Sequence, residues 1–216
     1  MKGYMRALLY WMLNIEKVFA IMVATIVAVV LLMTSADGGL EAREMVKIYL
    51  PMMGGILCMA IMMSASSYYI PQSMSMGATR KEVFCAMITA IHVVLLQTIL
   101  TAIIVNNFIM KGVFSSEYIL SAALIYVLAV GAGTLMCALS LKFGNKIAMI
   151  FYVITVIIFA VCGGFMGAFF SGGDELGLSL GGTFGMINKL WFVAILFDIL
   201  TMIPCYLSIR RYEVRV

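Results

Sequence analysis

Six long apolar stretches follow one another along the chain, separated by short polar connections. Five of them contain no Asp, Glu, Lys or Arg, and the last is interrupted only by Asp198. A helix needs about 20 residues, at about 1.5 Å per residue, to cross the hydrocarbon core of a bilayer. The pattern therefore predicts six transmembrane helices, near residues 18–35, 49–70, 84–108, 118–141, 147–170 and 190–209.

The apolar stretches do not alternate between apolar and polar residues, as the strands of a membrane β-barrel would over about ten positions. The composition agrees with helices in lipid: 64% of the 216 residues are hydrophobic and 11% are charged, whereas about 25% are charged in an ordinary soluble domain. A soluble enzyme, a disordered chain and a nucleic-acid-binding protein are excluded. We predict an all-α integral membrane protein in which six helices leave no room for a soluble domain.

The basic residues predict the orientation of these helices. If both termini are cytoplasmic, ten of the 14 Lys and Arg residues lie on the inner side, and only Arg43, Lys47, Lys111 and Lys189 lie outside. This distribution follows the positive-inside rule. Cytoplasmic termini also require an even number of spans, which the apolar pattern supplies.

The first 17 residues precede the first predicted span and carry an apolar stripe of their own. Its members recur at helical spacing, at Tyr4, Leu8, Trp11 and Ile15. Such a stripe is typical of a helix lying in the headgroup plane, and a frayed cytoplasmic tail is the alternative. We expect an interfacial amphipathic helix at residues 1–17, a turn into a transmembrane domain at residues 18–209, and a basic cytoplasmic tail at residues 210–216.

The five cysteines and 20 methionines do not form the pattern of a metal site. Zinc-binding cysteines recur at short, clustered spacings, which are absent here. Methionine thioethers suit Cu(I), but these methionines are scattered through apolar spans, where adaptable packing explains them better. We predict no metal and no cofactor in this chain.

Three polar residues inside the predicted spans are candidate functional residues, because polar groups are unfavourable in a bilayer. Asp198 lies about nine residues into the last span and His92 about ten residues into the third, so both lie near mid-depth. Asn106 lies on the same helical stripe as His92. A proton-coupled carrier would use such groups as a relay. Alternatively, they bond to neighbouring helices or line an aqueous cavity without titrating.

Small residues in the fifth predicted span indicate close helix packing. Gly163 and Gly167 form a GxxxG pair, and Gly164 lies beside them. Such faces allow helix backbones to approach closely within or between subunits. The sequence leaves open whether the glycine-rich connection at residues 171–188 is helical.

The connection between the second and third spans contains the most informative local signals. Pro71 can begin a short helix, where its missing N–H is harmless, and Gly77 can end that helix in the left-handed conformation. Thr79 and Glu82 have the spacing of a capping box for the third span. We therefore expect a short helix across the mouth of a hairpin, followed by a sharply defined start of the next span.

The segment Ser75-Met-Gly-Ala-Thr-Arg-Lys-Glu-Val-Phe84 resembles the small-Gly-x-Thr-Arg-Lys/Arg stretch that follows the second span of ABC-2 type permeases. These permeases are the membrane subunits of many bacterial ABC exporters. The basic tail Arg210-Arg-Tyr-Glu-Val-Arg215 is similar to the end of the small permeases of that family. The predicted six-span architecture resembles theirs over the whole chain.

The resemblance implies a half-transporter of the bacterial cytoplasmic membrane. In this family two permease subunits pair as a homodimer or heterodimer, and each binds an ABC ATPase through the short helix between spans two and three. The residues that would form this docking element are Pro71, Ser73, Met74, Met76, Gly77, Thr79, Arg80, Lys81 and Glu82. Because the chain has no G-x-x-x-x-G-K-[ST] phosphate loop, it is not an enzyme itself, and ATP and Mg²⁺ would bind to the separate ATPase.

The resemblance also implies export of a peptide antibiotic, a toxin or another amphiphile, with membrane lipid around the subunit and no nucleic acid as a partner. The alternative is a proton-coupled secondary carrier that uses His92 and Asp198. Carriers often show repeated halves, and this sequence contains no visible internal repeat. Nothing specific favours a third possibility, an assembly or sensor subunit that does not transport.

Overall fold

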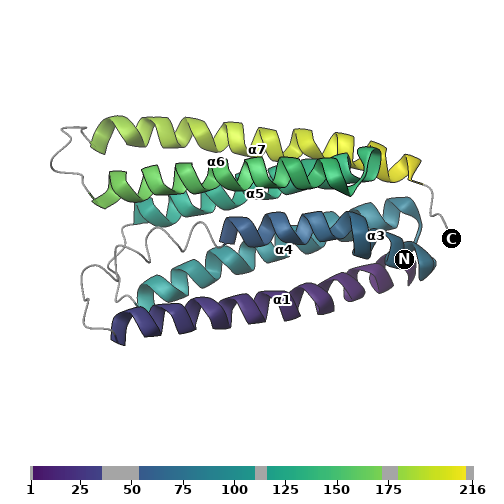
Figure 1. Ribbon diagram of the computed structural model, residues 1–216, viewed down its shortest axis with the longest axis horizontal. Helices are drawn as coiled ribbons and strands as arrows, with labels where there is room; N and C mark the ends of the chain where they lie inside the picture. Colours follow the sequence, from purple (N-terminus) through teal and green to yellow (C-terminus); the bar gives the residue numbers. More distant parts are fainter. Residues whose placement is uncertain (1, 36–53, 110–115, 172–179, 213–216) are drawn as a thin grey trace.

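The computed structural model describes residues 2–35, 54–109, 116–171 and 180–212, and throughout these ranges the chain is helical apart from short connections (Figure 1). A helical segment at residues 54–64 leads into the π-helical turn η1, and a second π-helical turn, η2, follows α4. The elements are α1 (Lys2–Ser35), η1 (Ala65–Tyr69), α3 (Ile70–Ser75), α4 (Arg80–Ile104), η2 (Val105–Ile109), α5 (Ser116–Phe143), α6 (Asn145–Ser171) and α7 (Leu180–Arg211).

Five of the described helices are long and apolar enough to cross a membrane. They are Gly3–Thr25, Gly54–Ser75, Arg80–Asn107, Ile119–Phe143 and Leu190–Arg211. The last four agree with predicted spans to within a few residues, which confirms the all-α character of the described chain. The backbone of α6 is helical over 27 residues, and its crossing as a sixth span stays a prediction.

α5 is the central helix of the bundle. Every residue from Ser121 to Val127 is buried, whereas most side chains of α7 between Leu190 and Leu200 are exposed. α5 packs most extensively against α7 and also contacts α4, α6 and η1. α1 lies on the other side of the bundle, against α4 (Figure 1).

α1 corrects one of our expectations, because Lys2–Ser35 is a single unbroken helix with no turn after residue 17. The predicted apolar stripe faces protein: Trp11 and Ile15 are fully buried, and Tyr4 and Leu8 pack against the core. The neighbouring helices α4 and α3 cover this stripe, which in an interfacial helix would face the membrane. Periodicity identifies an apolar face but not what covers it. The membrane position of residues 1–17 stays a prediction. Of the predicted tail at 210–216, Arg210 and Arg211 belong to α7, and residues 213–216 lie outside the described part of the chain.

Several basic side chains gather at one end of the bundle, which we call the basic end: Arg80, Lys81, Lys142, Arg210 and Arg211. The start of α4 meets the end of α7 there, where Arg80 Nη1 donates a hydrogen bond of 2.9 Å to the carbonyl oxygen of Arg210. α1 also begins at this end (Figure 1). The start of α1 and the end of α7 therefore lie at the same end of the bundle (Figure 1). Which side of a membrane this end faces stays a prediction.

Two glycines of α5 allow its neighbours to approach closely. A Cβ atom at Gly133 would lie 2.8 Å from Met62 Cβ and 3.2 Å from Met59 Cα, and one at Gly131 would lie 3.2 Å from Asp198 Cα. Such distances are tighter than ordinary van der Waals contact. The absence of side chains at these positions therefore sets the distance from α5 to the segment 54–64 and to α7.

We expect Gly133→Ala to lower the free energy of unfolding by about 1–3 kcal/mol, because the added methyl group must push the two helices apart. Ala132→Leu is the matched control: Ala132 is half-buried beside a cavity between α5, α6 and α7, so extra methyl groups have space. The thermal midpoint of the detergent-purified protein measures both. Equal midpoints for Gly133→Ala and the unmodified chain would show that this close contact is not required.

Candidate functional site

The start of α4 has the local structure that the sequence predicts. The Thr79 N–H donates to Glu82 Oε2 over 2.9 Å, and the Glu82 N–H donates to Thr79 Oγ1 over 3.4 Å, which completes the capping box. Gly77 has a φ of 83°, the left-handed conformation that ends a helix favourably at glycine. Pro71 lies in the first turn of α3. The capping box and the helix end at Gly77 are confirmed.

α3 nevertheless differs from the separate short helix that we expected across the mouth of the hairpin. The chain is helical without interruption from residue 54 to Ser75, and η1 immediately precedes α3. Proline cannot donate the helical hydrogen bond, and its ring collides with the carbonyl four residues earlier. A π-helical turn just before Pro71 is one way in which a helix continues past this conflict.

The segment Pro71–Glu82 is attached to the bundle on its inner side and exposed on its outer side. Ser73 is fully buried, and its Oγ accepts a hydrogen bond of 2.9 Å from Trp11 Nε1 on α1. The Trp11 ring packs on Tyr69, with 5.0 Å between ring centroids. Among the predicted docking residues, Gly77, Thr79, Arg80 and Lys81 are exposed, whereas Pro71, Met74, Met76 and Glu82 are intermediate.

A small network of hydrogen bonds connects η1, which immediately precedes α3, to α5 and α6. Ser66 Oγ donates to Ser140 Oγ over 2.8 Å, Ser140 Oγ donates to Asn145 Oδ1, and Asn145 Nδ2 donates to Ser67 Oγ over 3.0 Å. None of these residues is among the functional candidates that the sequence predicts. Their signal was small polar residues within or at the end of apolar spans, which is too common to single them out.

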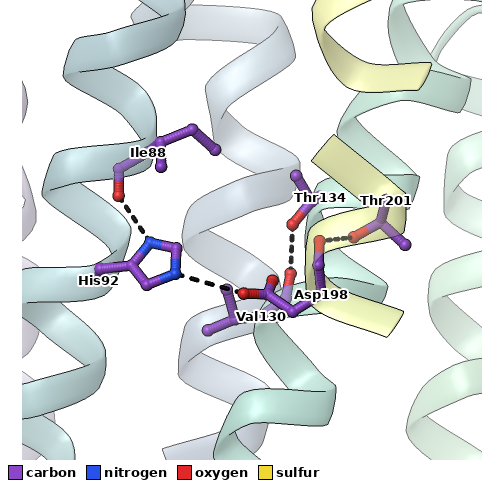
Figure 2. Close-up of polar contacts among 6 residues, drawn as sticks. All are labelled: Ile88, His92, Val130, Thr134, Asp198 and Thr201. Atoms are coloured by element: carbon purple, nitrogen blue, oxygen red, sulfur yellow. Dashed lines mark hydrogen bonds and ion pairs between the residues drawn. The ribbon is translucent and has the colours of Figure 1, made fainter. Parts of the chain in front are cut away.

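His92 of α4 and Asp198 of α7 lie together inside the bundle, although 106 residues separate them (Figure 2). His92 Nε2 is 3.3 Å from Asp198 Oδ2, and His92 Nδ1 is 2.8 Å from the carbonyl oxygen of Ile88. The Asp198 side chain is 8% exposed and that of His92 is 38% exposed. The sequence placed both residues near mid-depth, and the fold unites them.

The hydrogen bonds of His92 determine how many protons the pair holds. A carbonyl oxygen can only accept, so His92 Nδ1 carries a proton and donates it to Ile88. A hydrogen bond between Nε2 and Oδ2 then requires one further proton, carried either by the imidazole or by the carboxyl group. Both contacts can therefore be hydrogen bonds only when the pair holds one proton in addition to the one on Nδ1.

The second carboxylate oxygen, Asp198 Oδ1, is buried and has no hydrogen-bond partner among the described residues. The nearest threonine hydroxyls serve backbone carbonyls instead: Thr201 Oγ1 donates to Asp198 O and Thr134 Oγ1 donates to Val130 O (Figure 2). A buried polar atom without a partner costs about 1–3 kcal/mol. Oδ1 is therefore a buried acceptor whose hydrogen bond is not made within the described part of the structure.

The other predicted candidates do not join this pair. Asn106 is buried in η2, 14 residues beyond His92 along the same helix, or about 21 Å at the helical rise. Gly163, Gly164 and Gly167 lie in α6, and the side chains around them fall outside the described part of the structure. Of the connection at residues 171–188, the part from Leu180 onward belongs to α7. The described residues contain no group of three or more His, Cys, Asp or Glu side chains that could hold a metal ion.

A comparison of the chain with protein-family models, with curated proteins and with solved structures finds no match in any of the three. The resemblance to ABC-2 type permeases therefore depends on the residues of the segment 75–84, on the basic tail and on the arrangement of the spans.

We expect His92→Ala to destabilise the protein more than Asp198→Asn does. Removing the imidazole leaves a buried carboxylate without its partner, at a cost of about 1–3 kcal/mol, whereas Asn keeps the shape of Asp198 and removes the charge. The double variant should recover most of the loss, because no charge is then left unpaired. The thermal unfolding midpoints of the two single variants and of the double variant, measured in detergent, test this order. An Asp198→Asn variant that fails to insert or fold would show that the charge itself is structural.

Proposed function

We propose that the chain is the permease subunit of an ATP-driven ABC exporter in the bacterial cytoplasmic membrane, with a peptide antibiotic, a toxin or another amphiphile as its substrate. Five apolar helices of membrane-spanning length support a permease. In this proposal a second permease subunit completes the pathway, and a separate ATPase chain supplies the energy.

The observation that carries the proposal is the geometry of Pro71–Glu82 at the basic end. Its capped junction gives a fixed shape to the end of the bundle, and its exposed face combines Arg80 and Lys81 with the partly exposed Met74 and Met76. Methionine adapts to irregular surfaces, and basic side chains can pair with acidic residues of a soluble partner. This surface therefore suits contact with a separate protein.

Three hydrogen bonds attach Pro71–Glu82 and the neighbouring η1 to the rest of the bundle. Trp11 attaches it to α1, Arg80 attaches it to the end of α7, and the neighbouring Ser66 attaches it to α5. A partner that displaced Pro71–Glu82 would therefore move packed helices rather than a free loop. Rigid-body movement of packed helices is an established way to couple a local event to a distant site.

The His92–Asp198 contact favours a second candidate function, a proton-coupled secondary carrier. A hydrogen bond between the two side chains needs one exchangeable proton, Asp198 Oδ1 has no partner among the described residues, and His92 is partly exposed. Histidine changes its charge readily near neutral pH, so the pair could gain or lose a proton during transport. A carrier of this kind works without nucleotide.

Co-purification from the native host separates the two functions. The tagged chain should retain an ABC ATPase in mild detergent, and Lys81→Glu should reduce the retained ATPase at least tenfold, or by about 1.4 kcal/mol of binding free energy. Lys146→Glu is the matched control, because Lys146 is exposed in the first turn of α6, outside the docking segment. Equal loss in both variants, or the absence of any ATPase, would contradict the docking proposal.

The carrier function is tested in vesicles that contain only the purified chain. A pH gradient without nucleotide should drive no accumulation of amphiphilic peptide if the chain is an ABC permease. Accumulation that Asp198→Asn abolishes would instead establish the carrier.

A further inference from the structure

Two cavities lie along α5 and α7, one apolar and one at the basic end, and we call them together the groove. Its inner part is a cavity of about 320 Å³ between α5, α6 and α7, with Leu128, Ala132, Leu135 and Leu139 of α5 on one wall and Phe197 of α7 on another. The only polar side chain in its lining is Thr155, whose hydroxyl donates to the backbone oxygen of Phe151. This part of the groove offers nothing to a polar ligand.

The same two helices line a second cavity, of about 380 Å³, at the basic end. Lys142 of α5 and Arg211 of α7 line it, together with Ser208 and Pro204 of α7. Neither Lys142 nor Arg211 forms an ion pair within the described part of the chain, and Lys142 Nζ lies 4.9 Å from the centre of the Phe143 ring. The two charges are therefore available to a ligand.

Helical spacing places the two cavities on one continuous face. On α5, Leu128, Ala132, Leu135 and Leu139 recur every three or four residues, and Lys142 follows at the next step. On α7, Phe197, Pro204, Ser208 and Arg211 follow one another at intervals of seven, four and three residues. Residues at such intervals share a helix face. The apolar and basic cavities therefore follow each other along the same faces of α5 and α7.

The length of the groove matches one leaflet of a bilayer. Ala132 lies ten residues before Lys142, which is about 15 Å at the helical rise, and half of the hydrocarbon core is also about 15 Å thick. An acyl chain whose headgroup lies beside Lys142 would therefore reach the apolar cavity. The exposed side chains of Phe151 and Ile158 border that cavity, so a lipid can enter from the side of the bundle.

The charges at the basic end favour a negatively charged headgroup. The carboxyl ends of α5 and α7 each contribute about half a negative charge through their backbone dipoles. Lys142 and Arg211 contribute two positive charges, and they exceed the two helix dipoles by about one charge. A phosphate with a net negative headgroup is therefore attracted, and a zwitterionic headgroup much less so.

The geometry points to a binding site for an anionic phospholipid, with the headgroup phosphate between Lys142 and Arg211 and one acyl chain in the apolar cavity beside Ala132 and Phe197. This site does not depend on whether the chain acts as an exporter or as a carrier. It gives the permease a lipid of defined charge between α5 and α7.

Native mass spectrometry of the full chain in detergent tests the site, with dioleoyl phosphatidylglycerol and dioleoyl phosphatidylcholine as probes. The unmodified chain should bind phosphatidylglycerol at least tenfold more tightly. Lys142→Gln with Arg211→Gln should remove most of this preference. The matched control is Lys81→Gln with Arg210→Gln, which removes the same charge from a different cavity at the same end. Equal binding of the two lipids, or equal loss in both double variants, would overturn the proposal.

A second variant tests the acyl-chain part separately. Ala132→Phe fills the apolar cavity, so dioleoyl phosphatidylglycerol should bind at least fivefold more weakly, while short-chain dihexanoyl phosphatidylglycerol should bind unchanged. Unchanged binding of the long-chain lipid would remove the acyl-chain assignment. If Lys142→Gln with Arg211→Gln alters the oligomeric state rather than the bound lipid, the groove is an interface between subunits and the lipid site is wrong.

Discussion

The close approach of α7 and the segment 54–64 to α5 is the constraint on which the rest of the bundle depends. In lipid, helices gain little hydrophobic energy from each other, and packing must hold them together. Gly131 and Gly133 permit that packing on two faces of α5. Because α7 lies against Gly131, Asp198 is positioned to meet His92 of α4.

The helices and the capped start of α4 could be predicted because their signals are local. Charge-free stretches of sufficient length define the spans, and the Thr79–Glu82 capping box depends on residues three positions apart. The course of α1 could not be predicted in the same way. An apolar stripe such as the one that includes Trp11 and Ile15 can face either lipid or the protein interior, because both are apolar. In the structure these two side chains are buried against other helices.

The contacts of the candidate site depend on packing between distant segments, which explains why the sequence revealed only part of it. His92 and Asp198 were recognisable as polar residues in apolar spans, but nothing local indicates that α4 and α7 meet. The hydrogen bond between Trp11 and Ser73 could not be predicted either, because neither residue alone indicates that α1 and α3 lie side by side. The π-helical turn before Pro71 could not be predicted, because proline commonly stands at the start of a helix and therefore indicates that a new one begins.

A hydrogen bond between His92 and Asp198 needs one shared proton, and this requirement has an electrical consequence. With one shared proton the pair is neutral overall, whether that proton is on the imidazole or on the carboxyl group. The membrane voltage exerts almost no net electrical force on a pair whose net charge is zero. Loss of the proton would leave one negative charge inside the bundle, and an elementary charge that crosses the whole membrane changes energy by about 2.3 kcal/mol per 100 mV. The number of protons on this pair therefore sets the net charge at this point of the bundle on which a transmembrane voltage can act.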